Sequence, residues 1–218
     1  MAIKKSRIKP SHDDVTVLVH GIWMQGVMMS VMAKRLELLG FRTVAFSYNF
    51  LKHSPAENAC DLYRRIGELG ARKVHLVGHS LGGIVILHLL DQFPDLNVDK
   101  VVLVGSPVKG SYVAKRVHAN RMLRPLLGKS VKGGLLEGAP TFRGDRPLGI
   151  ITGSGSMGLL AVLYPPGDNS DGVVRDSETM IENATDRICI PSSHSAMIFS
   201  DRCADLIANF LNLGRFRV

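Results

Sequence analysis

Residues 74–87, with the sequence VHLVGHSLGGIVIL, decide the fold of this chain. The stretch 74–77, apolar except for His75, predicts a buried strand, and the apolar run that begins at Ile84 predicts a buried helix. Between them, residues 78–82 match the pattern G-x-S-x-G, in which small residues two positions before and after a serine let a sharp turn close. The stretch therefore predicts that Ser80 lies in a strained turn between a strand and a helix.

The context of Ser80 distinguishes this motif from a chance match. G-x-S-x-G alone is expected in roughly one in ten chains this rich in glycine, and a purely structural turn is then the alternative. A preceding strand and a following helix are what a nucleophilic serine in this motif requires. The start of the helix also supplies backbone N–H groups where negative charge develops on a substrate oxygen. We therefore predict Ser80 as a nucleophile and the N–H of Leu81 as one donor to the oxyanion.

Apolar, β-branched segments alternate with helical patterns on both sides of this turn, which is typical of a parallel α/β sheet. An N-cap, proline and glutamate at residues 54–57 predict the start of one of the helices. Strands are expected at residues 15–20, 43–48, 73–78, 100–105, 148–152 and 187–190, and helices at 27–39, 55–69, from 80 onward, within 111–127 and at 201–213. We predict an α/β fold with a mostly parallel sheet of about six strands flanked by helices.

The first predicted strand ends in His20-Gly21-Ile22-Trp23. A glycine at this point lets the chain cross the carboxyl edge of the sheet, where α/β proteins bind ligands. A second oxyanion donor is expected from this loop. We assign it to the N–H of Ile22, with Trp23 as the near alternative, and we expect His20 to be a structural histidine.

An acid and a base are expected to follow Ser80 in the chain order Ser, Asp or Glu, His. The loop 165–174 contains two aspartates, and Asp171 is favoured because the apolar residues 173–174 anchor it, whereas Asp168 is expected to brace the loop. His194 is the sole histidine beyond this loop, so it is the predicted general base. His79 lies on the turn itself, where its ring cannot easily accept the Ser80 proton.

Several residues near the edges of these motifs are candidates for substrate contacts. They are Trp23, Met24, Met157 and Met197, since flexible thioethers and an aromatic ring are suited to an acyl pocket. Packing in the core is the alternative for the methionines. Residues 106–146 form a basic, glycine-containing stretch that is expected to be an abbreviated cap on a single domain spanning residues 1–218.

These motifs together resemble the α/β-hydrolase superfamily, most closely its small lipases and esterases with a minimal core and the related deacylase-like hydrolases. The resemblance spans nearly the whole chain, and residues 105–107 and 110–111 contribute to it beside the stretches around Gly21, Ser80, Asp171 and His194. It implies hydrolysis of acyl esters through a covalent acyl-enzyme, without a metal or an organic cofactor. Only about a dozen residues precede the first predicted strand, so the first two strands of the full fold are expected to be missing.

Composition and charge bear on the metal sites, the location and the partners that can be expected of this protein. The chain has 218 residues and a formal net charge of +8, and its three cysteines form no CxxC pair that would indicate a zinc site. Without an apolar segment typical of a signal peptide or a membrane span, a cytoplasmic location is expected. Lys and Arg are scattered without a zinc-finger or RNP-like motif, so nucleic acid is not expected as a partner. Weak association with anionic membrane surfaces is expected, and the oligomeric state stays open.

Two functions other than ester hydrolysis remain open from the sequence. One is an acyltransferase, in which an alcohol other than water accepts the acyl group. The other is a binding module on a hydrolase scaffold, which the set Ser80, Asp171 and His194 disfavours.

Overall fold

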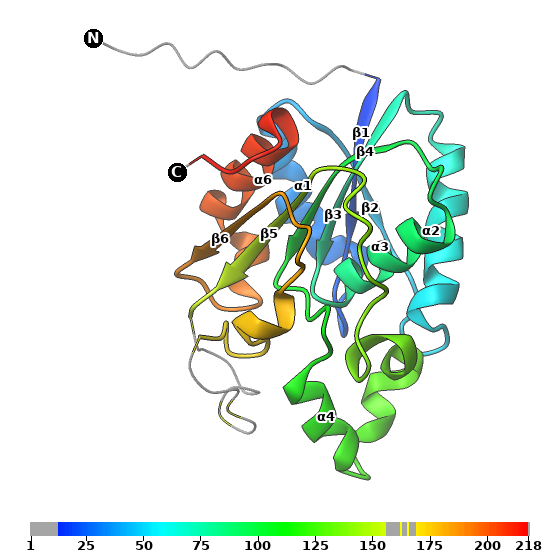
Figure 1. Cartoon of the computed structure of the whole chain (residues 1–218), viewed down its shortest axis with the longest axis vertical. Coiled ribbons are helices and arrows are strands. Elements are labelled where there is room, and N and C mark those ends of the chain that lie inside the picture. The colour runs from blue at the N-terminus through cyan, green and yellow to red at the C-terminus, as the bar shows by residue number, and fades with distance from the viewer. Residues whose placement is uncertain (1–12, 156–161, 163–164, 166–168, 218) are drawn as a thin grey trace.

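A six-stranded sheet forms the centre of the computed structural model, which describes residues 13–155, 162, 165 and 169–217 (Figure 1). The strands are β1 (Asp14–Val19), β2 (Arg42–Phe46), β3 (Lys73–His79), β4 (Val98–Val104), β5 (Leu148–Gly153) and β6 (Asp186–Ile190). Their order is β2-β1-β3-β4-β5-β6, and every neighbouring pair is parallel. The predicted α/β fold class and strand number are confirmed, and the carboxyl ends of all six strands meet at one edge.

Helices cover both faces of this sheet. They are α1 (Ser30–Leu38), α2 (Pro55–Glu68), α3 (Leu81–Gln92), α4 (Tyr112–Ala119) and α6 (Asp201–Leu213). Leu62 of α2 and Leu89 of α3 are fully buried in the cluster on one face, and Leu36 of α1 and Phe210 of α6 in the cluster on the other. Within the described part of the chain, no helix has the length and apolar character needed to cross a membrane.

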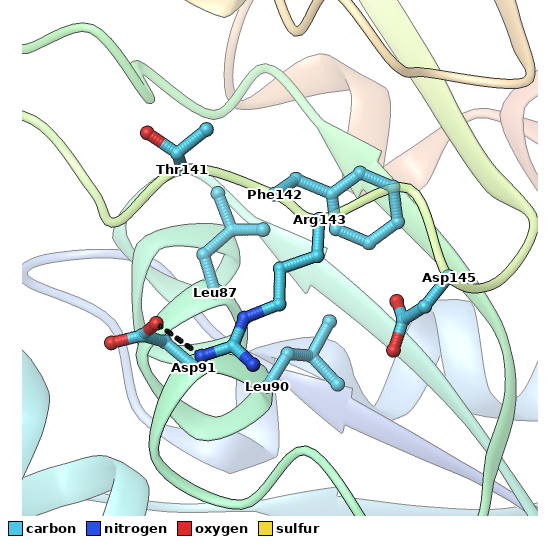
Figure 2. Close-up of a pocket in the computed structure, with 7 residues that line it drawn as sticks. All are labelled: Leu87, Leu90, Asp91, Thr141, Phe142, Arg143 and Asp145. Carbon is cyan, nitrogen blue, oxygen red and sulfur yellow. Dashed lines mark hydrogen bonds and ion pairs between the residues drawn. The ribbon is translucent and has the colours of Figure 1, made fainter.

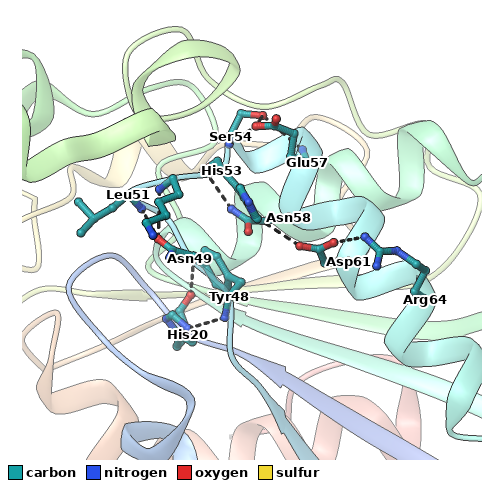
Figure 3. A network of polar contacts seen from close by, with 11 residues as sticks. His20, Tyr48, Asn49, Leu51, His53, Ser54, Glu57, Asn58, Asp61 and Arg64 are labelled. Atoms are coloured by element: carbon teal, nitrogen blue, oxygen red, sulfur yellow. Dashed lines mark hydrogen bonds and ion pairs between the residues drawn. The ribbon is translucent and has the colours of Figure 1, made fainter.

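The sequence pattern that predicts the start of α2 agrees with the structure. Ser54 Oγ accepts a hydrogen bond from the N–H of Glu57, and the Glu57 carboxylate accepts one from the N–H of Ser54 at 2.7 Å (Figure 3). Pro55 occupies the first turn, where its missing N–H costs nothing. The predicted capping box is therefore confirmed.

Two predicted helix boundaries differ from the structure. The helix expected from residue 27 begins as a 3₁₀ turn, Gly26–Met29, and becomes α-helical only at Ser30. The helix expected from Ser80 begins at Leu81, because Ser80 has a φ of 53° that is incompatible with a helix.

The segment after β4 packs on the beginning of α3. Helix α4 is followed by a 3₁₀ segment, Arg124–Ser130, and an irregular turn, Val131–Leu135. Leu81 and Ile84 of α3 form a buried cluster with Val113, Val117 and Leu127 of this segment. In Figure 1 the segment lies beyond the carboxyl edge of the sheet, at the bottom of the view.

Candidate active site

Ser80 occupies the tight turn between β3 and α3 that the motif predicts. Its φ of 53° and ψ of −122° are unusual for a residue with a side chain, and its N–H donates to the carbonyl of Val104 at 2.9 Å. A Cβ added to Gly82 would lie 2.2 Å from the carbonyl oxygen of Val19, and one added to Gly78 would lie 2.6 Å from the nitrogen of Gly83. Both motif glycines are therefore required by close backbone contacts.

Asp171 and His194 form a buried hydrogen-bonded pair. Nδ1 of His194 lies 2.7 Å from Oδ2 of Asp171, and because a carboxylate accepts, Nδ1 is the donor. Oδ1 of Asp171 accepts from the N–H groups of Val173 and Val174 at 3.0 Å and 2.7 Å. These bonds hold the carboxylate in one orientation and leave Nε2 of His194 available as a proton acceptor.

His79 connects the serine turn to the histidine loop. Its Nε2–H donates to the carbonyl of His194 at 3.0 Å, and the two rings lie with their centroids 4.7 Å apart. Burial, and secondarily the neighbouring His194, lower the pKa of His79 to about 3. His79 is thus neutral with its Nε2 engaged, so it links the two loops and its Nε2 is not free to accept a proton.

The pair also lies directly over the end of β4. A Cβ added to Gly105 would fall 3.0 Å from Oδ2 of Asp171 and 3.2 Å from Nδ1 of His194. The loops that follow β3, β4, β5 and β6 therefore meet at one edge of the sheet, as the motif order requires.

The loop after β1 comes close to the serine. A Cβ added to Gly21 would lie 2.9 Å from the Cβ of Ser80, so only glycine allows this approach. Ile22 and Trp23, the two candidates for the second oxyanion donor, line the same cavity as Ser80. Trp23 has a positive φ of 58°, and its Nε1–H donates to the carbonyl of Leu126 at 2.8 Å, which connects this loop to the segment after α4.

His20 holds the backbone of this loop in place (Figure 3). Its Nδ1–H donates to the carbonyl of Gly21 at 2.8 Å, and its Nε2 accepts from the N–H of Tyr48 at 3.3 Å. The ring stacks on Tyr48 at 4.3 Å between centroids, and the Tyr48 hydroxyl donates to the His20 carbonyl at 2.8 Å. Burial lowers the pKa of His20, so the ring remains neutral and keeps both bonds.

This bond to the Gly21 carbonyl has a consequence for Ile22. In a trans peptide the C=O of one residue and the N–H of the next point in opposite directions. By holding the Gly21 oxygen, His20 also fixes the direction of the Ile22 N–H. His20 has structural contacts, as expected, and they hold the loop that carries Ile22 and Trp23, the two candidate oxyanion donors.

A small, mostly apolar cavity that is partly open to solvent adjoins Ser80. One wall comes from the loops that carry the predicted residues, and the other from the segment after β4. Its lining consists of Ile22, Trp23, Ser80, Pro107, Ser111, Val113, Ala114, Val117, Leu127, Leu135, Val173 and Val174. The spacing of residues 113, 114 and 117 on one helix face is a sequence signal for this wall that the motif search did not use.

The methionines predicted to contact substrate lie elsewhere. Met24 is half-buried against the core of α1 and α6, and Met197 is fully buried with its Cε beside Gly105. Neither lines the cavity, so core packing, the alternative given for them, is where the structure places both. Met157 and Asp168 lie outside the described residues.

A second, smaller hollow lies at the far end of α3 (Figure 2). It is formed by Leu87, Leu90 and Asp91 of α3 and by residues 141–145, and Arg143 pairs with Asp91 at 3.4 Å across it. It contains none of the predicted site residues.

Comparison with solved structures identifies the fold. The chain superimposes on lipase BlEst2 of Bacillus licheniformis in its mature form with a TM-score of 0.73 at 20% identity, covering 95% of this chain and 94% of that one. For the metagenomic carboxyl esterase MGS0156 the TM-score is 0.68 at 17% identity, and the match covers 92% of this chain and 75% of that one. For carboxylesterase CesB of Bacillus subtilis the TM-score is 0.61 at 14% identity, and the match covers 93% of this chain and 85% of that one. The protein therefore has the α/β-hydrolase fold.

The family is identified by the first two-thirds of the chain. Residues 4–142 match the family described as domain of unknown function DUF7379, and the chain belongs to this family. The matched range includes Gly21 and Ser80, and it ends before Asp171 and His194. A search of curated proteins by sequence finds no match.

Proposed function

We propose that this protein is a serine hydrolase of carboxylic esters, similar to esterases and lipases, that acts through a covalent acyl-enzyme without a cofactor. The observation that carries the proposal is the buried hydrogen bond of 2.7 Å between His194 and Asp171, beside the strained turn of Ser80. We also propose that residues 1–218 form one domain, with residues 106–146 as a short cap over the cavity.

In this mechanism Ser80 attacks the ester carbonyl while Nε2 of His194 accepts the proton of its hydroxyl. Asp171 stabilises the imidazolium that forms and keeps Nδ1 protonated. The N–H groups of Leu81 and Ile22 donate to the tetrahedral oxyanion. The imidazolium then protonates the departing alcohol, and water repeats the same steps on the acyl-enzyme.

The cavity supports an ester with an apolar acyl group. Aliphatic side chains form most of its lining, and they favour apolar groups over charged ones. Ser111 is the polar side chain of this wall besides Ser80, but its Oγ accepts the N–H of Ala114 as the cap of α4. The acyl chain is therefore expected between α4 and the loop of Ile22.

Turnover of p-nitrophenyl esters of graded acyl length tests the proposal. Ser80→Ala and His194→Ala should each lower turnover by several orders of magnitude, and the double variant should be little worse, because the triad acts as a unit. A fluorophosphonate should label the peptide that contains Ser80 in the wild type only. Substantial turnover in Ser80→Ala, or labelling at another residue, contradicts the assignment.

The two alternatives give different results in the same assay. An acyltransferase would give more transesterified product than free acid when a competing alcohol is added. A binding module would show neither turnover nor labelling of Ser80 in the folded wild type.

A further inference from the structure

Nearly all of the net positive charge of the chain lies in one segment. Residues 106–136, here called the basic cap, contain seven Lys and Arg residues and no Asp or Glu. The rest of the chain contains twenty Lys and Arg residues and nineteen Asp and Glu residues, so its net charge is almost zero. Lys and Arg occur along the whole chain, as expected, but in the basic cap no acidic residue offsets the charge of the seven that it contains.

The charged side chains of the basic cap point to solvent. All seven are exposed, namely Lys109, Lys115, Arg116, Arg121, Arg124, Lys129 and Lys132. The inner side of the same segment, with Val113, Val117 and Leu127, forms the wall of the cavity at Ser80. The outer side is thus a positively charged surface placed directly over the candidate active site.

Apolar side chains are exposed in the midst of this charge. Met122 is 87% exposed and Leu126 is 50% exposed. Trp23 and Leu51 are also exposed and contact the backbone of the basic cap: Trp23 donates to the carbonyl of Leu126, and the N–H of Lys129 donates to the carbonyl of Leu51 at 3.2 Å. Four exposed apolar residues therefore lie in the basic cap or are bonded to its backbone.

We propose that the basic cap is a docking surface for anionic lipid. Exposed apolar side chains surrounded by Lys and Arg match a lipid surface in two independent ways, since the charges attract anionic headgroups and the apolar groups enter the boundary of the acyl chains. A nucleic acid would use the charge but gives Met122 and Leu126 no apolar environment. Docking on this side brings the cavity at Ser80 next to the lipid.

Co-sedimentation of the full chain with vesicles tests this proposal. We expect binding to vesicles of phosphatidylglycerol and phosphatidylcholine, little binding to pure phosphatidylcholine, and a steep loss between low and physiological salt. Arg121→Gln with Arg124→Gln should weaken binding by about tenfold or more. The matched control is Arg202→Gln with Arg215→Gln, which removes the same charge from exposed positions in and after α6, away from the cap (Figure 1).

Two further variants make the outcome decisive. Met122→Ser with Leu126→Ser should weaken vesicle binding at constant charge, and Ser80→Ala should bind as well as the wild type, which separates docking from the proposed catalysis. Equal losses in the cap and control arginine variants, or equal binding to neutral vesicles, would overturn the proposal. Unchanged vesicle binding in the Met122/Leu126 variant, with equally tight binding to an oligonucleotide, would overturn it in favour of a polyanion site. Thermal unfolding of each variant confirms that it is folded.

Discussion

The backbone N–H of His194 donates to the backbone carbonyl of Asp171 at 2.9 Å, so these two residues are joined through their main chains as well as their side chains. The loop after β5 and the loop after β6 are therefore fixed relative to each other. An orienting carboxylate must be held to within about half an ångström, and two bonds between the same residues provide that precision.

This double connection predicts the effect of Asp171→Asn. The amide can still accept the N–H groups of Val173 and Val174 through its oxygen, so we expect the fold to be preserved. Its NH₂ group faces Nδ1 of His194 and favours the wrong tautomer, so turnover should fall by roughly a thousandfold or more. Steady-state turnover at matched thermal stability measures this.

Asp168→Asn is the control, since the same loop contains both aspartates. It should lower turnover by about tenfold or less, by analogy with residues outside a triad. A larger loss at Asp168 than at Asp171 would transfer the role of orienting acid to Asp168.

The order of the site residues could be predicted from sequence because each follows a recognisable strand. Ser80 was predicted from glycine, strand and helix patterns, and Asp171 and His194 from the chain order Ser, Asp or Glu, His; the structure brings Asp171 and His194 within 2.7 Å of each other. The contact of His20 with Tyr48 could not be found this way, because it depends on the register that aligns Val19 of β1 with Phe46 of β2. The apolar wall was also missed, since Met24 and Met197 were chosen by their nearness to motifs, whereas the packing of α4 on α3 decides what faces the cavity.

His20→Phe tests the role of His20 in the oxyanion loop. The phenyl ring can retain the stack on Tyr48 but loses the bonds to Gly21 and to the Tyr48 N–H. If the Ile22 N–H is displaced, kcat should fall by about ten- to a hundredfold, less than the full loss of an oxyanion donor, with KM nearly constant. Tyr48→Phe removes only the hydroxyl bond to His20 and should have a smaller effect. A kcat within threefold of the wild type for a stable His20→Phe protein would refute this role.

Acid pH should destabilise the fold through buried neutral histidines. His75 in β3 is buried, and burial lowers its pKa to about 4 despite the attraction of Asp99. In the unfolded chain His75 takes up a proton near pH 6.5, whereas in the folded chain it does so only near pH 4. The contribution of neutral His75 to the free energy of unfolding is therefore complete above about pH 6.5 and is lost as the pH falls toward 4. For His75 alone this amounts to about 3 kcal/mol.

Urea unfolding of the wild type and of His75→Leu at pH 7 and at pH 4 measures this contribution. The free energy of unfolding of the variant should fall by about 3 kcal/mol less than that of the wild type between the two pH values. An identical fall in both proteins would mean that His75 is not the group responsible.

The close approach of Asp171 and His194 to Gly105, directly after β4, gives a last prediction. Gly70 is its control. Gly105 and Gly70 have the same φ of +56°, so alanine at either position adds a similar strain of about 1 kcal/mol. The added Cβ at Gly70 meets nothing within 4 Å, so Gly70→Ala should lower stability by that amount and leave turnover unchanged.

At Gly105 the same Cβ would lie 2.9 Å from Cε of Met197 and 3.0 Å from Oδ2 of Asp171. Met197 can give way, but the carboxylate is held by Val173, Val174 and His194, so Gly105→Ala should displace the pair. Because a shift of about 1 Å in a catalytic group costs about a hundredfold in rate, turnover should fall by at least that factor while the protein stays folded. Both variants are compared by turnover well below their melting temperatures. Equal turnover in the two would show that β4 does not determine the position of Asp171 and His194.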